Sequence, residues 1–204
     1  GFRPERGCHT ALEQIRHQFK AITWYIEGDI KGCFDSINHD KLLGILSKKI
    51  QDNRLLRLIR NGLQAGVVDD WIYERTNSGT PQGGILSPLL ANIYLNELDT
   101  FVETMLMPEW NIGDERSRNP EYRQYEYLIK KAKERQDYEE LKRLKVERRS
   151  IPSKDVKDPN FRRLKYVRYA DDFLIGFIGS HAEATEIKAR LSEFLGTELK
   201  LNLN

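Results

Sequence analysis

The sequence predicts an α+β fold in which a mostly antiparallel sheet packs on helices. Amphipathic helical stretches alternate with short strand-forming runs, but the alternation lacks the regular period of parallel strand–helix–strand units. The strongest strand signal is split by two adjacent acids, which is typical of a hairpin. With 204 residues and 39% hydrophobic residues, the chain can form one large domain or two small ones. No run of 18 apolar residues occurs, which excludes a membrane-spanning helix.

The N-terminal part predicts three helices and one strand. Apolar residues at helical spacing indicate the helices, and a run rich in aromatic and β-branched residues indicates the strand. Ser36 or Asn38 is the expected cap of the second helix. The predicted helices cover residues 9–21, 36–50 and 53–63, and the strand covers 23–31.

The middle of the chain predicts strand and turn over residues 67–84, ending in a Gly/Pro-rich loop, and then a long helix over 87–106. Ser87 is the expected N-cap of that helix, and Pro88 lies in its first turn. One apolar face is expected to be buried; it comprises Leu90, Ile93, Tyr94, Leu98, Phe101 and Met105.

Residues 108–160 are highly charged and predict helix from about Pro120 to Arg149, which we interpret as an insertion into the fold. Between Arg116 and Arg168 the chain has 18 Lys plus Arg against 9 Asp plus Glu, although its overall net charge is only +2. Such a basic block is typical of a surface that binds a polyanion. A solvated helix with i,i+4 ion pairs is the alternative.

The C-terminal part predicts two strands over residues 161–180 and a helix over 181–196. Ser180 is the expected cap of the helix and Gly196 its end. A last strand is expected to begin within residues 197–204.

Asp171 and Asp172 are the two acids inside the apolar run KYVRYADDFLIGF. Neighbouring carboxylates repel each other and are costly to bury unpaired, so we place them at a hairpin tip. A divalent cation would remove the repulsion, and Mg²⁺ takes oxygen ligands. Asp29, at the end of an apolar strand, is the expected third carboxylate of a two-metal site. A solvated turn is the alternative reading of the pair taken alone.

Four stretches, in order, resemble the reverse transcriptases encoded by group II introns, the intron maturases. They are GFRPERGCHTAL, EGDIKGCFDSINHDKLL, NSGTPQGGILSPLLANIYLNELD and YVRYADDFLIG. The resemblance covers residues 1–107 and 160–204. It implies a right-hand polymerase fold of fingers and palm, with an antiparallel palm sheet packed on helices and a helical insertion. We expect the start of the fingers, the thumb and the maturase domain to lie outside this chain.

The resemblance also implies a division of the chain into segments. These are partial fingers (1–22), palm with motifs A and B (23–107), the basic helical insertion (108–160), and palm with motif C and the start of motif D (161–204).

The site residues follow position by position from the same resemblance. Asp29 and Asp171 are the expected main ligands of two Mg²⁺ ions, with Asp172 assisting and the carbonyl of Ile30 completing one shell. Phe34 falls at the aromatic gate that selects dNTPs over rNTPs; simple core packing is its alternative role. The remaining expected contacts to nucleotide or template are Gln82, Gly83 and Arg3.

The resemblance predicts an RNA-directed DNA polymerase, a nucleotidyltransferase that extends a DNA primer on intron RNA with dNTPs and assists splicing and mobility. The insertion is expected to bind intron RNA, and four arginines are the expected contacts: Arg148, Arg149, Arg162 and Arg163. The expected setting is a ribonucleoprotein of the bacterial cytoplasm, with an organelle as the alternative and no role for a membrane. Monomer and homodimer both stay open.

Two alternatives share parts of this sequence pattern. A splicing maturase that only binds RNA would need no polymerase site, but Asp29, Asp171 and Asp172 are all present. A retron or diversity-generating reverse transcriptase would share the chemistry; the form GFRPERG and the insertion before YADD favour an intron origin.

Overall fold

The computed structural model describes residues 5–30, 32–65, 67–69, 72–74, 79 and 86–203, with only the backbone for 67–69 and 72–74. The chain forms two compact units: Gly1–Trp110 together with Arg163–Asn204, and Asn111–Arg162. No helix within the described ranges is both long and apolar enough to cross a membrane.

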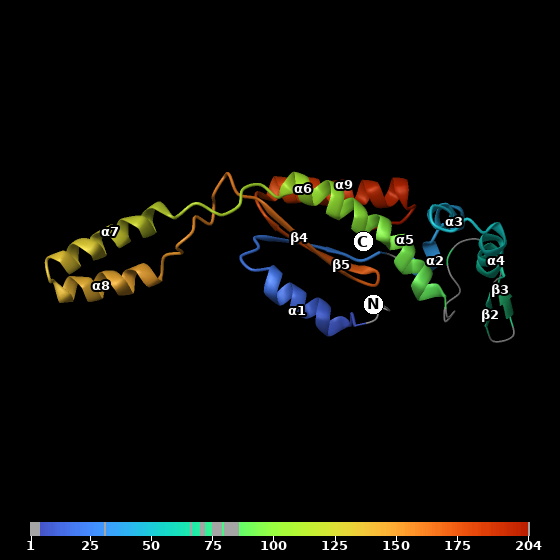
Figure 1. The fold of residues 1–204 in the computed structure, drawn as a ribbon, viewed down its shortest axis with the longest axis horizontal. Helices are drawn as coiled ribbons and strands as arrows, with labels where there is room; N and C mark the ends of the chain where they lie inside the picture. The colour runs from blue at the N-terminus through green and yellow to red at the C-terminus, as the bar shows by residue number, and fades with distance from the viewer. Residues whose placement is uncertain are drawn as a thin grey trace. The chain divides into compact units, whose positions relative to one another are not determined.

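A three-stranded antiparallel sheet forms the centre of the first unit (Figure 1). It consists of β1 (Trp24–Gly28), β4 (Arg163–Tyr169) and β5 (Asp172–Ile178), in the order β1-β5-β4. β5 pairs with both neighbours, with Ile26 opposite Ile175 on one side and Tyr166 opposite Ile175 on the other. The predicted α+β fold with an antiparallel sheet is confirmed.

Helices cover both faces of this sheet (Figure 1). One face lies against α5 (Ser87–Phe101), α6 (Met107–Trp110) and α9 (His181–Glu198), and the other against α1 (Cys8–Gln18). The main core lies on the α5/α9 side, because the inward side chains of β5 and the helices bury each other there. The core residues exposed by 0% include Tyr94, Leu98, Ile175, Phe177, Ile187 and Leu191.

The remaining elements of this unit follow the predicted order, with one helix more than expected. The predicted helix over 36–50 corresponds to α3 (His39–Ser47), and Asn38 caps it as one of the two expected caps by accepting from the Lys41 amide; a short helix precedes it and ends at Ser36. The elements are α2 (Cys33–Ser36), α3 (His39–Ser47), α4 (Asn53–Gln64), and the hairpin of β2 (Val67–Asp69) and β3 (Ile72–Glu74).

The expectation that Ser87 caps α5 is wrong. The N-cap is Leu86, and Ser87 is already the first helical residue, with Pro88 behind it. A cap side chain must accept from the free amides of the first turn. The Ser87 side chain is 5% exposed and does not cap the helix.

The expected burial of Met105 is also wrong, because α5 continues into a π-helix, η1 (Val102–Leu106). A π-helix has i→i+5 hydrogen bonds and so holds more residues per turn than an α-helix. The buried positions shift accordingly: Val102 and Leu106 are 0% exposed, whereas Met105 is 56% exposed.

Ser180 caps α9 as predicted, in a capping box with Glu183. The prediction that Gly196 ends the helix is wrong, since α9 runs to Glu198. The end is instead held by packing, where the Tyr94 hydroxyl donates to the Leu199 carbonyl at 2.6 Å. The expected last strand is reduced to one antiparallel bridge between Ile30 and Leu203.

The second unit is a helical hairpin of α7 (Pro120–Glu134) and α8 (Tyr138–Arg149). Asn119 caps α7 and Asp137 caps α8, each through a side chain that accepts a backbone amide of the first turn. The two helices run antiparallel, since Arg148 near the end of α8 lies over the ring of Tyr122 near the start of α7, 5.2 Å from its centroid.

Candidate functional site

The two adjacent acids lie at the tip of the β4–β5 hairpin, as predicted. Tyr169 pairs with Asp172, which leaves Ala170 and Asp171 as a two-residue turn. Ala170 has a φ of 57°. Two-residue hairpins favour positive φ at the first turn position, although a residue with a Cβ loses roughly 1–2 kcal/mol there. The tip is therefore tight and slightly strained.

β1 brings Asp29 to the same end of the sheet. Gly28, the last residue of β1, pairs with Phe173, the residue after Asp172. Asp29 therefore follows β1 at the end of the sheet where Asp172 begins β5. Gly28 is required at this point: a Cβ there would lie 2.1 Å from the Phe173 ring.

Electrostatics also indicate that the acids are close to one another. The pKa of the Asp172 carboxyl is raised, first by burial and then by the charges of Asp171, Asp29 and Glu27. Cys33, which lines the same small cavity as Asp171, has its thiol pKa raised to about 12 by burial and by the charge of Asp171. The thiol therefore stays protonated and is no candidate nucleophile.

The donor set at this end of the sheet fits a hard cation. Carboxylate oxygens are the ligands of Mg²⁺, which usually takes one or two protein carboxylates and completes its shell with water and substrate phosphate. Within the described ranges, no group of three or more His, Cys, Asp or Glu side chains already forms a metal cage.

Phe34 lies beside the acidic turn. It extends from α2 and lines a small cavity together with Asn92 of α5 and with Ala170 and Asp171 of the turn. Its side chain is only half-buried and packs against the core from outside. Ile30, by contrast, is 1% exposed and forms the bridge to Leu203, so its side chain belongs to the core.

Three expected contacts, Arg3, Gln82 and Gly83, lie outside the described residues. The same loop is described at Gly79, which is fixed from two sides. Its amide donates to the Ile37 carbonyl at 2.9 Å, and its carbonyl lies 2.6 Å from Nε2 of the buried His39. Gly79 has a φ of 89° and no room for a Cβ beside Asp35. No sequence motif indicated that His39 would hold this loop.

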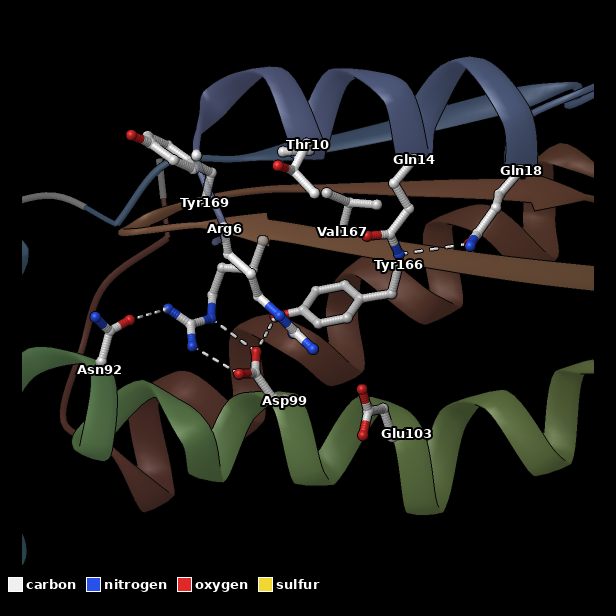
Figure 2. A pocket seen from close by; sticks show the side chains of 13 residues that line it. Arg6, Thr10, Gln14, Gln18, Asn92, Asp99, Glu103, Tyr166, Val167 and Tyr169 are labelled. Atoms are coloured by element: carbon white, nitrogen blue, oxygen red, sulfur yellow. Dashed lines mark hydrogen bonds and ion pairs between the residues drawn. The ribbon is translucent and has the colours of Figure 1, made fainter. Parts of the chain in front are cut away.

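A second group missed by sequence reasoning lies behind the hairpin (Figure 2). Asp99 of α5 accepts from Tyr166 at 2.8 Å and from Arg168 at 2.7 and 2.6 Å, so both β4 side chains are tied to the helix. The group borders a cavity of about 430 Å³ between α1, β4 and α5, into which the polar side chains Thr10 and Gln14 project. An Arg directly before YADD is the only sequence signal that could have indicated it.

The four arginines expected to bind RNA differ in their surroundings. Arg148 lies on Tyr122 and is half-buried, and Arg162 donates to the carbonyls of its own loop, at 3.0 Å for Phe161. Arg163 is the first residue of β4, in the other unit. Arg149 alone among these four is exposed.

Arg149 belongs to an exposed basic stripe on α8 that the sequence analysis did not single out. Lys142, Lys145 and Arg149 are spaced i, i+3 and i+7, so they lie on one face of the helix, and all three are exposed. We refer to these three residues as the α8 stripe.

The described part of the chain has an antiparallel sheet with Asp171 in a tight hairpin turn, Asp172 directly after it and Asp29 directly after the neighbouring strand β1. The chain belongs to the reverse transcriptase (RNA-dependent DNA polymerase) family, which it matches over residues 1–204.

Three individual relatives have names that refer to introns. The chain is 43% identical to the group II intron-encoded protein LtrA of Lactococcus lactis subsp. cremoris, over 100% of this chain and 35% of that protein. It is 45% identical to an uncharacterized 91 kDa protein in the cob intron of Schizosaccharomyces pombe, over 95% of this chain and 24% of that protein. Nuclear intron maturase 1, mitochondrial, of Arabidopsis thaliana is 23% identical over 95% of this chain. The chain spans about a third or less of these relatives' length.

Proposed function

We propose that this chain is the catalytic part of an RNA-directed DNA polymerase encoded by a group II intron. It would transfer deoxynucleotides from dNTPs to the 3′ hydroxyl of a DNA primer paired with intron RNA. The observation that carries the proposal is the convergence of Asp29, Asp171 and Asp172 at one end of the sheet, in a chain of the reverse transcriptase family.

In the proposed mechanism, Asp29, Asp171 and Asp172 would hold two Mg²⁺ ions together with the carbonyl of Ile30. When bound, Mg²⁺ lowers the pKa of an attacking hydroxyl and offsets charge on the transferred phosphate. The protein fixes the direction of its carboxylates through the hairpin and through β1, because rigid elements hold a site better than loops do. The proposed nucleotide contacts of Gln82 and Gly83 come from the loop that His39 fixes at Gly79.

The proposed function assigns segments of the chain to the parts of a polymerase fold. We propose that residues 23–107 and 161–204 are the palm and that residues 1–22 are part of the fingers. The three-stranded sheet with the acids at one end supports the palm assignment. Residues 108–160 are the proposed insertion between motifs B and C.

Phe34 is the proposed gate against ribonucleotides. Phe34→Ala should raise rNTP incorporation relative to dNTP incorporation by about 10-fold or more, because loss of the ring removes the steric exclusion of a 2′ hydroxyl. Single-nucleotide primer extension with matched dNTP and rNTP measures the ratio of the two kcat/KM values. Leu86→Ala, at an exposed position before α5, is the control. Unchanged selectivity in Phe34→Ala would assign Phe34 to packing alone.

We further propose that the second unit binds intron RNA and so assists splicing. Its support is the net positive charge of residues 111–162, which contain 15 Lys plus Arg against 11 Asp plus Glu, and the exposed α8 stripe. Lys and Arg that contact phosphates release counterions from RNA, so such binding weakens steeply with salt. The group II intron relative supports intron RNA as the partner.

Replacing the α8 stripe with glutamine should weaken intron RNA binding and lower the magnitude of the slope of log K against log salt by about 2 to 3, since up to three phosphate contacts are lost. Filter binding or fluorescence anisotropy at several salt concentrations gives the slope. The matched control neutralises three exposed lysines of the first unit: Lys20, Lys188 and Lys200. Equal slopes for the stripe variant and the control would mean that the stripe is merely a solvated surface.

A further inference from the structure

Arg168 connects the acidic turn to α5. Its side chain is only 5% exposed, and its guanidinium faces three acceptors at once. Nε and Nη2 donate to the two oxygens of Asp99, and Nη1 donates to the carbonyl of Ala170 at 2.6 Å. Asn92, two turns before Asp99 on α5, accepts a longer bond from Nη1 at 3.4 Å. Arg168 therefore binds the helix with one edge and the turn with the other.

The partners of Arg168 fix its direction. Figure 2 shows Asp99 pointing from α5 toward Tyr166 of β4, whose hydroxyl donates to the same carboxylate. Burial and the charge of Asp99 raise the pKa of the Tyr166 phenol, so this hydroxyl stays protonated and remains a donor. A planar guanidinium paired with both oxygens of a carboxylate has little freedom to turn.

A buried ion pair is a poor explanation for stability alone. Removing two charges from water offsets most of their attraction, and apolar replacements of whole pairs are often neutral or stabilising. What an apolar pair could not supply is the bond to the Ala170 carbonyl. That bond holds the residue with the strained φ of 57°, directly before Asp171.

We propose that Arg168, oriented by Asp99, is a positioning residue that sets the direction of the Asp171 carboxylate relative to α5. This inference rests on the proposed polymerase function and deepens it. Ala170 and Asp171 share their cavity with Phe34 and Asn92, and α5 also contributes Asn92 to the guanidinium contacts. The same bond therefore sets the position of the acidic turn relative to Phe34, the proposed gate.

The test removes both charges together, because removal of one alone would leave its partner buried and unpaired. In the double variant Arg168→Met with Asp99→Asn, the Asn oxygen can still accept from Tyr166, but the donor to Ala170 is gone. In the full-length protein we expect kcat for primer extension on RNA to fall by about 10- to 100-fold, as expected for a small misplacement of a reacting group. The Mg²⁺ concentration for half-maximal activity should rise, while the melting temperature and intron RNA affinity stay near wild type.

Two further variants control for charge and surface effects. Arg168→Lys keeps the charge beside Asp99 but lacks the planar fork, so it should retain the fold and show part of the loss in kcat. Arg190→Met breaks a more exposed ion pair of the same unit, with Glu109 at 2.7 Å, and should leave kcat and Mg²⁺ dependence unaltered.

Hydrogen exchange provides a readout that does not depend on activity. In the double variant, amides within Val167–Leu174 should exchange faster, and those of α9 should not. Wild-type exchange in the hairpin, or wild-type kcat and Mg²⁺ dependence in a folded double variant, would overturn the positioning role. If the double variant unfolds, the hydrogen exchange and kinetics of Arg168→Lys test the positioning role by the same criteria. Inactive wild-type protein with faster hairpin exchange in the variant would refute the polymerase function and leave the positioning role standing.

Discussion

Asp171→Ala in the full-length protein should lower Mg²⁺-dependent primer extension on an RNA template by about a thousandfold or more, because a metal-binding carboxylate supports several kcal/mol of transition-state stabilisation and about 1.4 kcal/mol corresponds to tenfold in rate. Intron RNA affinity should stay nearly intact, since the basic surface lies in another unit of the chain. Steady-state extension and RNA binding, measured on one preparation, check both parts.

The matched control for Asp171→Ala is Glu186→Gln, which removes an exposed carboxylate from α9. It should extend primers at the wild-type rate. If Asp171→Ala retained primer extension, Asp171 would not be a metal ligand. The hairpin tip would then not be a polymerase site. Loss of extension together with loss of RNA binding would indicate unfolding, which circular dichroism detects.

Gly28→Ala should destabilise the protein by about 1–3 kcal/mol, because the new Cβ would lie 2.1 Å from the buried Phe173 ring. For a domain of this size, the melting temperature should fall by roughly 3–10 °C. Primer extension should fall as well, since Asp29 and Asp172 are the residues next to this pair. Thermal melting by calorimetry and primer extension at a fixed temperature measure the two effects.

A control and a compensating change sharpen the Gly28 prediction. Gly44→Ala, inside α3 with nothing within 4 Å of the new Cβ, should leave the melting temperature unchanged or raise it. Adding Phe173→Leu to Gly28→Ala should recover part of the loss, because the smaller side chain vacates the space that the Cβ needs. A melting temperature for Gly28→Ala equal to that of Gly44→Ala would contradict the close approach.

The local signals in the sequence were sufficient where the structure is decided locally. The pair Asp171 and Asp172 in an apolar run predicts a hairpin, because a turn leaves two neighbouring carboxylates in contact with solvent. The structure places both residues at the hairpin tip. Ser180 with Glu183 caps α9 because both partners of the capping box lie within one turn. These elements need no information about the rest of the chain.

Other elements depend on contacts between distant segments, which single-sequence patterns do not contain. Gly196 resembles a helix end, but the last turn of α9 is held by Tyr94 from a helix 105 residues away. Ser87 has the chemistry of a cap, but packing buries its side chain. Arg168 has no distinguishing sequence pattern, and its role depends on the ion pair with Asp99 of α5. In each case a tertiary partner outweighs the local preference.

The π-helix of Val102–Leu106 connects α5 to α6, and the number of residues in it determines which way the side chains of α6 point. α6 follows directly and ends with Trp110, whose ring meets Phe177 edge-on at 5.6 Å between centroids. Each residue of an α-helix turns the chain by about 100°, so one residue fewer would rotate Trp110 away from Phe177. The exposed side chains of this segment are free to vary, whereas its length is not.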